Sequence, residues 1–459
     1  MKGILSKVES VWGVKKEFRL KVFFLATSFF MLMVCQAIWR PLKNAVFLTM
    51  VGVKQIPTAK MLLIFPVIIL IIIYSKLVDW LRRHHLFYWF TITFALIGFV
   101  MCYFLIHPVY GIANTTKSAY RLFGWIFYFY MESFGAFMSA VFWSFANSVN
   151  KPKDAKNYYS IFVTGSKLGG MLGAGTLYYI AACTNLTSLV LVPSCLAAGC
   201  FALLGAATSI FMLMKFVPGY LMHGYEAAYQ YEKKKKKEKT SIWKSIKQAF
   251  DGILSIFKNP YVFGIFAIIM SYETIIVIID YLVSVLAAKN NPTAGGLISF
   301  FSLYMLLMHS LGLLIALFGT APIQRFLGVR ISLFVNPLVC IIALPIIFFF
   351  PNINVLFYSL IILRAFNYGL NHPTREALFI PTTKAIKFKA KAWTDAFGSR
   401  ISKASGSFMN KYLLMGFVRQ SSLFCLAVSF LWLPVAYLLG KKYFKAISNN
   451  EVIGAENNE

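Results

Sequence analysis

The chain has 459 residues, of which 59% are hydrophobic and only 13% charged, and its mean hydropathy is +0.69. A soluble domain would carry about 25% charged residues, so this composition excludes a soluble protein. Many apolar runs reach the ~20 residues that a bilayer-spanning helix needs, whereas a membrane β-barrel would show alternating segments of about 10 residues. The sequence therefore predicts an all-α polytopic membrane protein.

The N-terminal stretch MKGILSKVESVWGVKKEFRLK contains no apolar core followed by a small-residue cleavage site. We therefore predict no signal peptide, and the first spanning helix would itself direct insertion.

Apolar windows of about 19 residues predict twelve transmembrane helices. Six precede a polar stretch, at 22–50, 59–78, 86–106, 122–148, 156–183 and 187–216. Six follow it, at 261–288, 296–320, 330–350, 353–371, 393–418 and 421–440. The predicted organisation is an N-terminal six-helix bundle (1–216), a basic linker (217–260), a C-terminal six-helix bundle (261–445) and a tail (446–459).

Lysines and arginines are unevenly distributed over the loops between these helices. Most lie in the N-terminal segment, in the linker and in every second loop, and the opposite side has only Lys54, Lys60, Lys117, Arg121, Lys289 and Arg419. Because cytoplasmic loops are enriched in Lys and Arg, we predict that both termini and the linker are cytoplasmic.

The linker carries much of the positive charge. Its tract EKKKKKEK (232–239) is interpreted as a solvated loop near the anionic inner leaflet. No aromatic platform or recognition motif accompanies it, so we expect no nucleic-acid binding. Residues 241–257 space their apolar side chains for one helical face and predict an amphipathic helix on the membrane surface.

The two halves echo each other. Helix 2 ends in VDWLRRHH (78–85) and helix 8 in IQRFLGVR (323–330), both interpreted as basic cytoplasmic turns. FANSVNKP (145–152) corresponds to FNYGLNHP (366–373), and GSKLGG (165–170) to ISKASG (401–406). Parallel repeats of six helices are typical of major-facilitator-like transporters, which bind substrate between the halves near the membrane midplane. We therefore predict this fold.

Seven cations fall inside the predicted helices, at Arg40, Lys43, Lys167, Arg364, Arg400, Lys403 and Lys411. Each would cost about 3 kcal/mol at mid-helix if it faced lipid. Only four acids lie within helices to balance them, at Glu132, Glu273, Asp280 and Asp395. The surplus of positive charge predicts a cavity that binds an anion, and several converging cations suit a polyphosphate better than a monocarboxylate.

The spacing of these charges along the helices indicates which of them belong to one binding site. Arg40 and Lys43 share a helix face, as do Arg400 and Lys403, because each pair is three residues apart. We predict a phosphate-binding set of Arg40, Lys43, Lys167, Arg400 and Lys403, and an acidic set of Glu132, Glu273 and Asp280 that governs pairing and release. For Lys411 and Arg364, the alternative is that the side chain reaches an interface.

Other motifs carry no chemistry. GSKLGGMLGAG (165–175) lacks the G-x-x-x-x-G-K-[ST] spacing of a phosphate loop, and its glycines Gly165, Gly169 and Gly173 predict a stripe for close helix packing. The seven cysteines contain no C-x-x-C pair and the six histidines no metal spacing. We expect no metal site, no cofactor and no enzymatic activity.

Several segments resemble the ATP/ADP translocase (nucleotide transporter) family of obligate intracellular bacteria and plastids. They are RPLKNAVFLT (40–49), MESFGAFMSAVFWSFANSV (131–149), DAKNYYSIFVTGSKLGG (154–170), PTREALFIP (373–381) and KFKAKAWTDAFGSRISKASGS (387–407). By its motifs, the resemblance implies that Lys43, Glu132 and Lys403 are functional, together with Asp280 or Glu273. Asn44 and Lys167 depart from the family pattern, which usually has aspartate and asparagine there.

The resemblance implies exchange of ADP and phosphate for ATP by alternating access, with nucleotide as the substrate and the lipid bilayer as the environment. Phosphate or a proton is a candidate co-substrate. Alternatives are uptake of other nucleotides (GTP, other NTPs or NAD) by exchange or proton coupling, and, more remotely, a membrane-embedded enzyme acting on phosphorylated lipids. We expect a monomer in the inner (cytoplasmic) membrane of an intracellular bacterium.

Overall fold

A computed structural model describes residues 16–150, 152–184, 186–222, 259–315, 318, 320–383, 386, 394, 398–449 and 451–454. Within these ranges the protein is helical, and extended pairing is confined to one bridge between Thr382 and Ile453. The all-α class predicted from composition is confirmed. The tract 232–239, the amphipathic segment 241–257 and Asp395 lie outside the described residues.

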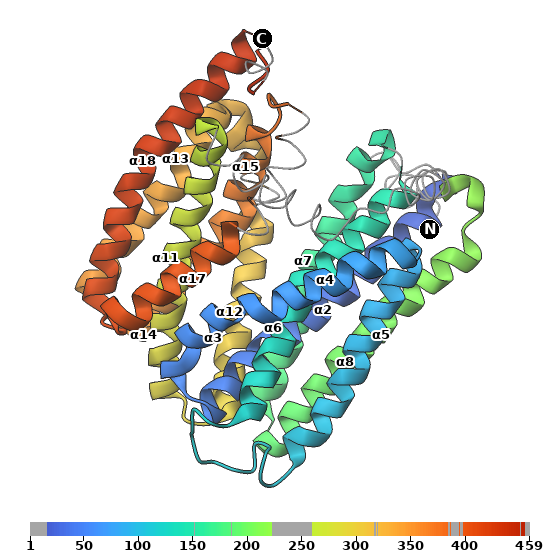
Figure 1. The fold of residues 1–459 in the computed structure, drawn as a ribbon, viewed down its shortest axis with the longest axis vertical. Coiled ribbons are helices and arrows are strands. Elements are labelled where there is room, and N and C mark those ends of the chain that lie inside the picture. Colours follow the sequence, from blue (N-terminus) through green and yellow to red (C-terminus); the bar gives the residue numbers. More distant parts are fainter. Residues whose placement is uncertain are drawn as a thin grey trace. The chain divides into compact units, whose positions relative to one another are not determined.

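The first six predicted helices are present and labelled in Figure 1. They are α2 (Arg19–Met50), the second helix in two pieces α3 (Ile56–Leu62) and α4 (Ile64–Trp80), α5 (Arg83–Ile106), α6 (Leu122–Val149), α7 (Pro152–Cys183) and α8 (Ser188–Phe216). Short turns η1 (Lys16–Phe18), η2 (Val53–Gln55) and η3 (Gly219–Met222) precede or follow them.

The second six are equally clear in the described part of the chain. They are α11 (Pro260–Asn290), α12 (Ala294–Leu314), α13 (Thr320–Phe349), α14 (Ile353–Phe366) continued by η5 (Asn367–Asn371) and α15 (His372–Leu378), α17 (Ser399–Met409) continued by η8 (Asn410–Leu414), and α18 (Val418–Ser448). The turn predicted at 323–330 corresponds to a kink at Gly328, where two helical stretches of α13 meet; its φ of +70° suits a residue without a Cβ.

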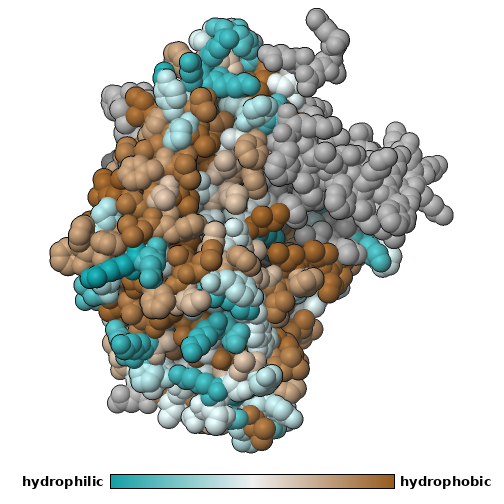
Figure 2. Space-filling model, turned by 60° about the vertical axis from the view of Figure 1, so that its left-hand side comes forward, coloured by the Kyte–Doolittle hydropathy of each residue, from teal (hydrophilic) through white to brown (hydrophobic). Residues whose placement is uncertain are grey.

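Among the described residues, nine segments are long and apolar enough to cross a membrane. Large apolar side chains also cover much of the surface, as the extensive brown areas of Figure 2 show. On α18, Leu431 is 70% exposed and Leu438 64% exposed. Such exposure would favour aggregation in water and is expected where helices face lipid tails. The protein is a multi-pass membrane protein.

The described residues group into two compact units. Those of Met1–Gly52, Phe65–Lys239 and Asn291–His309 form the first unit, and those of Val53–Ile64, Thr240–Asn290 and Ser310–Glu459 form the second. The first unit therefore includes most of α12, which comes from the second half of the sequence. The second unit includes η2 and α3, which come from the first half.

In the first unit, the glycine stripe of α7 packs directly on α2. A Cβ at Gly169 would lie 2.4 Å from the carbonyl oxygen of Phe30, and one at Gly173 would lie 2.8 Å from that of Val34. Gly165, one turn earlier, faces the same helix at 3.6 Å. The packing role predicted for these glycines is confirmed at Gly169 and Gly173, where only hydrogen fits between the two backbones, and Gly165 lies at ordinary contact distance.

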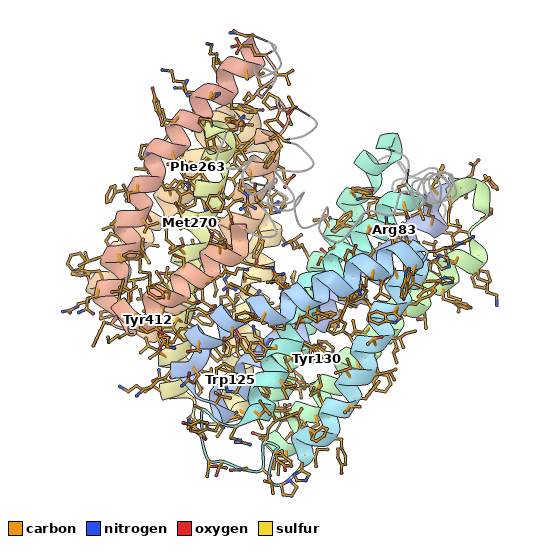
Figure 3. All side chains as sticks on the ribbon, in the orientation of Figure 1. Arg83, Trp125, Tyr130, Phe263, Met270 and Tyr412 are labelled. Atoms are coloured by element: carbon orange, nitrogen blue, oxygen red, sulfur yellow. The ribbon has the colours of Figure 1, made fainter. Side chains whose placement is uncertain are left out.

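Aromatic residues complete this unit around Trp39 of α2, which is 1% exposed. Its Nε1 donates to the carbonyl oxygen of Leu196 in α8 at 3.2 Å, and a Cβ at Gly199 would lie 2.0 Å from Nε1. Tyr130 of α6, labelled in Figure 3, donates to the carbonyl oxygen of Phe94 in α5. These bonds satisfy the polar ends of large apolar side chains within the helix packing.

In the second unit, α11 is the central helix and contacts α14, α17 and α18. A Cβ at Gly406 of α17 would lie 3.1 Å from the carbonyl oxygen of Thr274. Asn410 donates to the carbonyl oxygen of Val277 at 3.3 Å. Close approach of α17 to α11 thus brings the charged residues of both helices within reach of one another.

We expect that Gly169→Ala destabilises the protein, because the added methyl would require α7 to move away from the α2 backbone. Overpacking of this kind costs about 1–3 kcal/mol. Thermal unfolding in detergent measures the effect. Gly205→Ala is the matched control, since its Cβ would lie 3.7 Å from the nearest atom, the flexible Met31 side chain. Equal unfolding temperatures for the two variants would contradict the packing argument.

Candidate functional site

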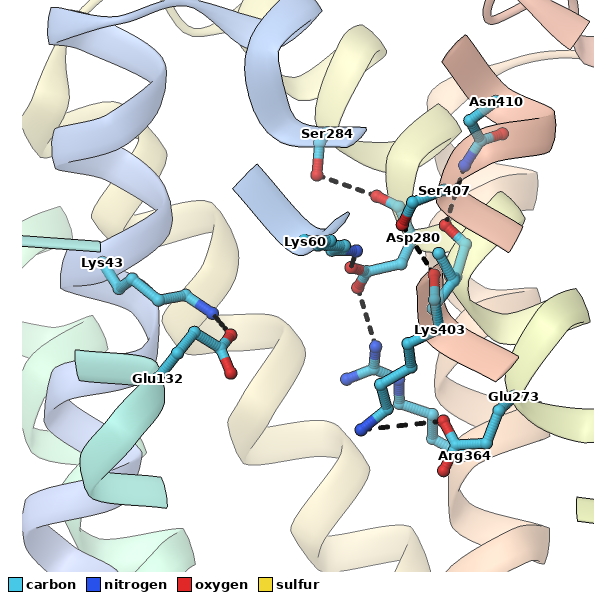
Figure 4. Close-up of polar contacts among 11 residues, drawn as sticks. Lys43, Lys60, Glu132, Glu273, Asp280, Ser284, Arg364, Lys403, Ser407 and Asn410 are labelled. Carbon is cyan, nitrogen blue, oxygen red and sulfur yellow. Dashed lines mark hydrogen bonds and ion pairs between the residues drawn. The ribbon is translucent and has the colours of Figure 1, made fainter. Parts of the chain in front are cut away.

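The first unit holds a buried ion pair between Lys43 of α2 and Glu132 of α6 (Figure 4). The lysine side chain is 8% exposed and the glutamate side chain 32%. The Lys43 ammonium also lies 4.9 Å from the ring centroid of Tyr128, one turn before Glu132 on α6. Carboxylate and ring together compensate a positive charge that is largely out of water.

The helix periodicity explains why Lys43 points at α6. Trp39, Lys43 and Phe47 are spaced by four residues and therefore occupy one face of α2. The Trp39 ring packs on Phe134 at 4.8 Å and the Phe47 ring on Tyr128 at 4.7 Å. The aromatic residues on either side thus fix the lysine against α6.

The structure also brings Arg40 and Lys167 to a common neighbour in the first unit. Both lie close enough to His309 of α12 to act on it electrostatically. Arg40 and Lys167 are both partly buried, on α2 and α7 respectively. Two of the cations predicted to bind phosphate therefore flank one buried imidazole.

The second unit holds a three-residue charge cluster centred on Asp280 of α11 (Figure 4). Lys60 of α3 contacts one carboxylate oxygen at 2.8 Å, and Arg364 of α14 contacts the other at 2.8 Å. The Arg364 side chain is only 6% exposed and that of Lys60 16%. One carboxylate thus contacts cations from two different helices.

A second pair in this unit links Lys403 of α17 to Glu273 of α11 at 3.8 Å (Figure 4). Ser399, one turn earlier on α17, donates to the same glutamate at 3.2 Å. The lysine side chain is 50% exposed. Because the side chain is half exposed and its ammonium lies 3.8 Å from the carboxylate, the Lys403–Glu273 contact is weak. Arg400, the other predicted cation of α17, follows Ser399 in the chain and is partly buried.

Sequence reasoning missed Lys60 and Arg364 as members of this cluster. The cation distribution places Lys60 on the outer side, at the start of the predicted helix 59–78, and the structure has it in the short helix α3. For Arg364, the sequence leaves open whether the side chain reaches an interface, and the structure buries it against Asp280. Lys60 lies next to an apolar run and Arg364 lies inside one. A cation in such a position needs a partner, and this pattern could have indicated that both residues belong to the site. Lys411 lies in η8 with its ammonium 5.1 Å from the Tyr412 ring centroid.

Helix irregularities mark the surroundings of these charges. Pro41 follows Arg40 inside α2 and removes one backbone donor from the helix. The π-helical turns η5 and η8 follow Arg364 and Lys403, respectively, within a few residues. Single π-turns occur frequently at functional sites of helical proteins.

Comparison with solved structures supports the fold. A bacterial homologue of the iron transporter ferroportin in an inward-facing state has a TM-score of 0.60 at 12% identity, covering 91% of this chain and 99% of that one. The xylose transporter XylE from E. coli in an inward open conformation has a TM-score of 0.58 at 12% identity, covering 90% and 94%. The predicted major-facilitator-like fold is confirmed.

Comparison of sequences gives the family. The "ADP,ATP carrier protein 1" of Rickettsia prowazekii is 23% identical over 492 residues, covering 96% of this chain and 97% of the relative. The protein of the same name from Chlamydia trachomatis is 23% identical over 504 residues, covering 96% and 92%. The model of the TLC ATP/ADP transporter family matches residues 4–356 and 352–444. The chain therefore belongs to the TLC ATP/ADP transporter family of membrane nucleotide transporters.

Proposed function

We propose that the protein exchanges ATP for ADP across its membrane by alternating access. The observation that carries the proposal is the set of opposite-charge contacts within the helices of both units, at Lys43–Glu132, Lys403–Glu273 and Lys60–Asp280–Arg364. Family membership and the carriers named among its relatives support nucleotide as the substrate.

The acids would act as stand-ins for phosphate. With no nucleotide bound, Glu132 neutralises Lys43 and Glu273 neutralises Lys403, so neither cation is left uncompensated in a poorly solvated interior. A phosphate group carries more negative charge than a carboxylate and would displace it. Arg40, Lys167 and Arg400 would then add contacts to the phosphate chain, since Arg can hold two oxygens at once.

The same acids would permit release. A purely cationic site would hold a polyphosphate too tightly for turnover. A displaced carboxylate regains its lysine when the nucleotide leaves, which offsets part of the cost of breaking the phosphate contacts. Exchange is then driven by the nucleotide gradients, with Asp280 or Glu273 serving the second unit as Glu132 serves the first.

We propose a cytoplasmic location for both termini, because lysines and arginines are concentrated on that side. The membrane is proposed to be the inner (cytoplasmic) membrane of an intracellular bacterium; the named relatives come from Rickettsia and Chlamydia. The molecule is proposed to act as a monomer.

Reconstitution into liposomes tests the proposed exchange. We expect labelled ATP to enter vesicles loaded with ADP and not empty ones, with little sensitivity to an uncoupler. Exchange of ATP⁴⁻ for ADP³⁻ moves one net charge. An imposed membrane potential should therefore change the driving force by about 2.3 kcal/mol per 100 mV, and the rate of exchange should change with it.

The outcomes separate the candidate functions. Uptake into empty vesicles that an uncoupler abolishes would replace exchange by proton coupling through Glu132 or Asp280. Stronger competition by unlabelled GTP or NAD than by ATP would change the nucleotide. Absence of uptake of all three nucleotides would overturn the proposal.

A further inference from the structure

His309 is a buried imidazole of α12 that the charge pairs described above do not use. Its side chain is 5% exposed, and neither Nδ1 nor Nε2 has a hydrogen-bond partner in the described part of the structure. A buried polar group without a partner costs about 1–3 kcal/mol. An unpaired buried group in a native protein calls for an explanation. One explanation is that the imidazole forms its hydrogen bond with a bound ligand.

The imidazole ring of His309 packs closely against a glycine of α7. A Cβ at Gly170 of α7 would lie 2.9 Å from both Nε2 and Cε1 of His309. No larger residue could stand at Gly170 without displacing the imidazole. The α12 helix therefore presents the ring directly to the α7 backbone, one turn from Lys167, which precedes Gly170 by three residues.

The electrostatic surroundings favour an anion. Among the described residues, Lys167 and Arg40 act electrostatically on the imidazole, and both are cationic. All three residues belong to the first unit, on α7, α2 and α12. In the described residues, Arg40 has no carboxylate partner within ion-pair distance.

We propose that His309 binds phosphate together with Arg40 and Lys167. The three side chains would form one subsite for the phosphate chain of the nucleotide. An imidazole N–H would donate to a phosphate oxygen while the two cations compensate its charge. This inference rests on the proposed function and assigns the subsite to the polyphosphate, not to the ribose or the base. An uncharged base would gain little from two flanking cations.

Binding to the purified wild type and variants tests this assignment, with inorganic tripolyphosphate and ATP as probes. We expect His309→Leu to weaken both by about tenfold, the effect of losing one hydrogen bond to a charged group. His309→Gln keeps an N–H donor and should recover binding to within about threefold of wild type. Met305→Leu, a volume-conserving change at a residue that is 3% exposed on the same helix, is the matched control.

A second variant guards against misfolding of His309→Leu. Gly170→Ala leaves the imidazole present but requires it to move, since the new methyl would lie 2.9 Å from the ring. We expect it to weaken tripolyphosphate binding several-fold, as His309→Leu does. Unfolding temperatures measured in parallel identify any variant whose loss is one of folding, and the remaining variant then decides.

The possible results are distinct. Loss of ATP affinity with unchanged tripolyphosphate affinity would overturn the assignment, because His309 would then contact ribose or base. Unchanged affinity for both probes in His309→Leu and Gly170→Ala would also overturn it. If wild-type protein binds tripolyphosphate through His309 but exchanges no nucleotide in liposomes, the proposed function fails while the phosphate subsite stands.

Discussion

Replacing Asp280 by asparagine is expected to cause the largest loss of stability of any single charge substitution described here. One carboxylate serves both Lys60 and Arg364, each at 2.8 Å, and these cations are 16% and 6% exposed. Removing one partner of a buried pair costs about 3–5 kcal/mol, because the remaining charge is left uncompensated. Thermal unfolding in detergent should show a fall of many degrees, accompanied by loss of nucleotide exchange.

Two further variants make this result specific. Asp280→Glu keeps the charge and should retain most of the stability. Adding Arg364→Met to Asp280→Asn removes the more deeply buried uncompensated cation and should recover part of the unfolding temperature without restoring exchange. Glu451→Gln, at an exposed position, should stay within about 0.5 kcal/mol of wild type. An Asp280→Asn protein as stable as wild type would contradict the cluster as a stabilising element.

The second large effect is expected at Lys43. Lys43→Ala should lower the rate of ATP/ADP exchange at least 100-fold, because it removes a phosphate-binding cation and leaves the Glu132 carboxylate to repel the nucleotide. Liposome exchange assays at several ATP concentrations measure the loss. Lys411→Ala is the matched control: this lysine lies in η8 beside the Tyr412 ring, and its removal should change exchange less than twofold.

A double substitution separates stability from substrate binding at this pair. Lys43→Ala with Glu132→Ala removes both charges, so the unfolding temperature should return toward that of wild type, as replacing a whole buried pair is often nearly neutral. Exchange should stay lost, because the Lys43 ammonium proposed to bind the phosphate is still absent. Recovery of exchange in the double variant would show that Lys43 serves only to neutralise Glu132.

Much of the fold could be predicted because helix position is a local property. A run of about 20 apolar residues must span a bilayer as a helix, since the backbone has no other hydrogen-bond partners there. The predicted helix at 122–148 corresponds to α6 (Leu122–Val149), and that at 261–288 to α11 (Pro260–Asn290). The turn predicted at 323–330 corresponds to the kink of α13 at Gly328.

The candidate site could be predicted only in part. Charges inside apolar runs are visible in the sequence, and their cost implies partners. The partners themselves are not visible: Lys60 and Asp280 are 220 residues apart, and Arg364 and Asp280 are 84 apart. The sequence alone therefore leaves the surroundings of Arg364 open and places Lys60 with the cations of the outer side.

The sequence by itself determined that this is an all-α membrane protein, where its helices lie, that Gly165, Gly169 and Gly173 pack closely, and that its interior carries excess positive charge. Each of these follows from composition and periodicity along one helix. Only the tertiary structure decided that Lys43 pairs with Glu132, that α3 brings Lys60 to Asp280, and that Gly170 makes room for the buried ring of His309. Such choices depend on which helix faces are brought together, and no local pattern encodes that.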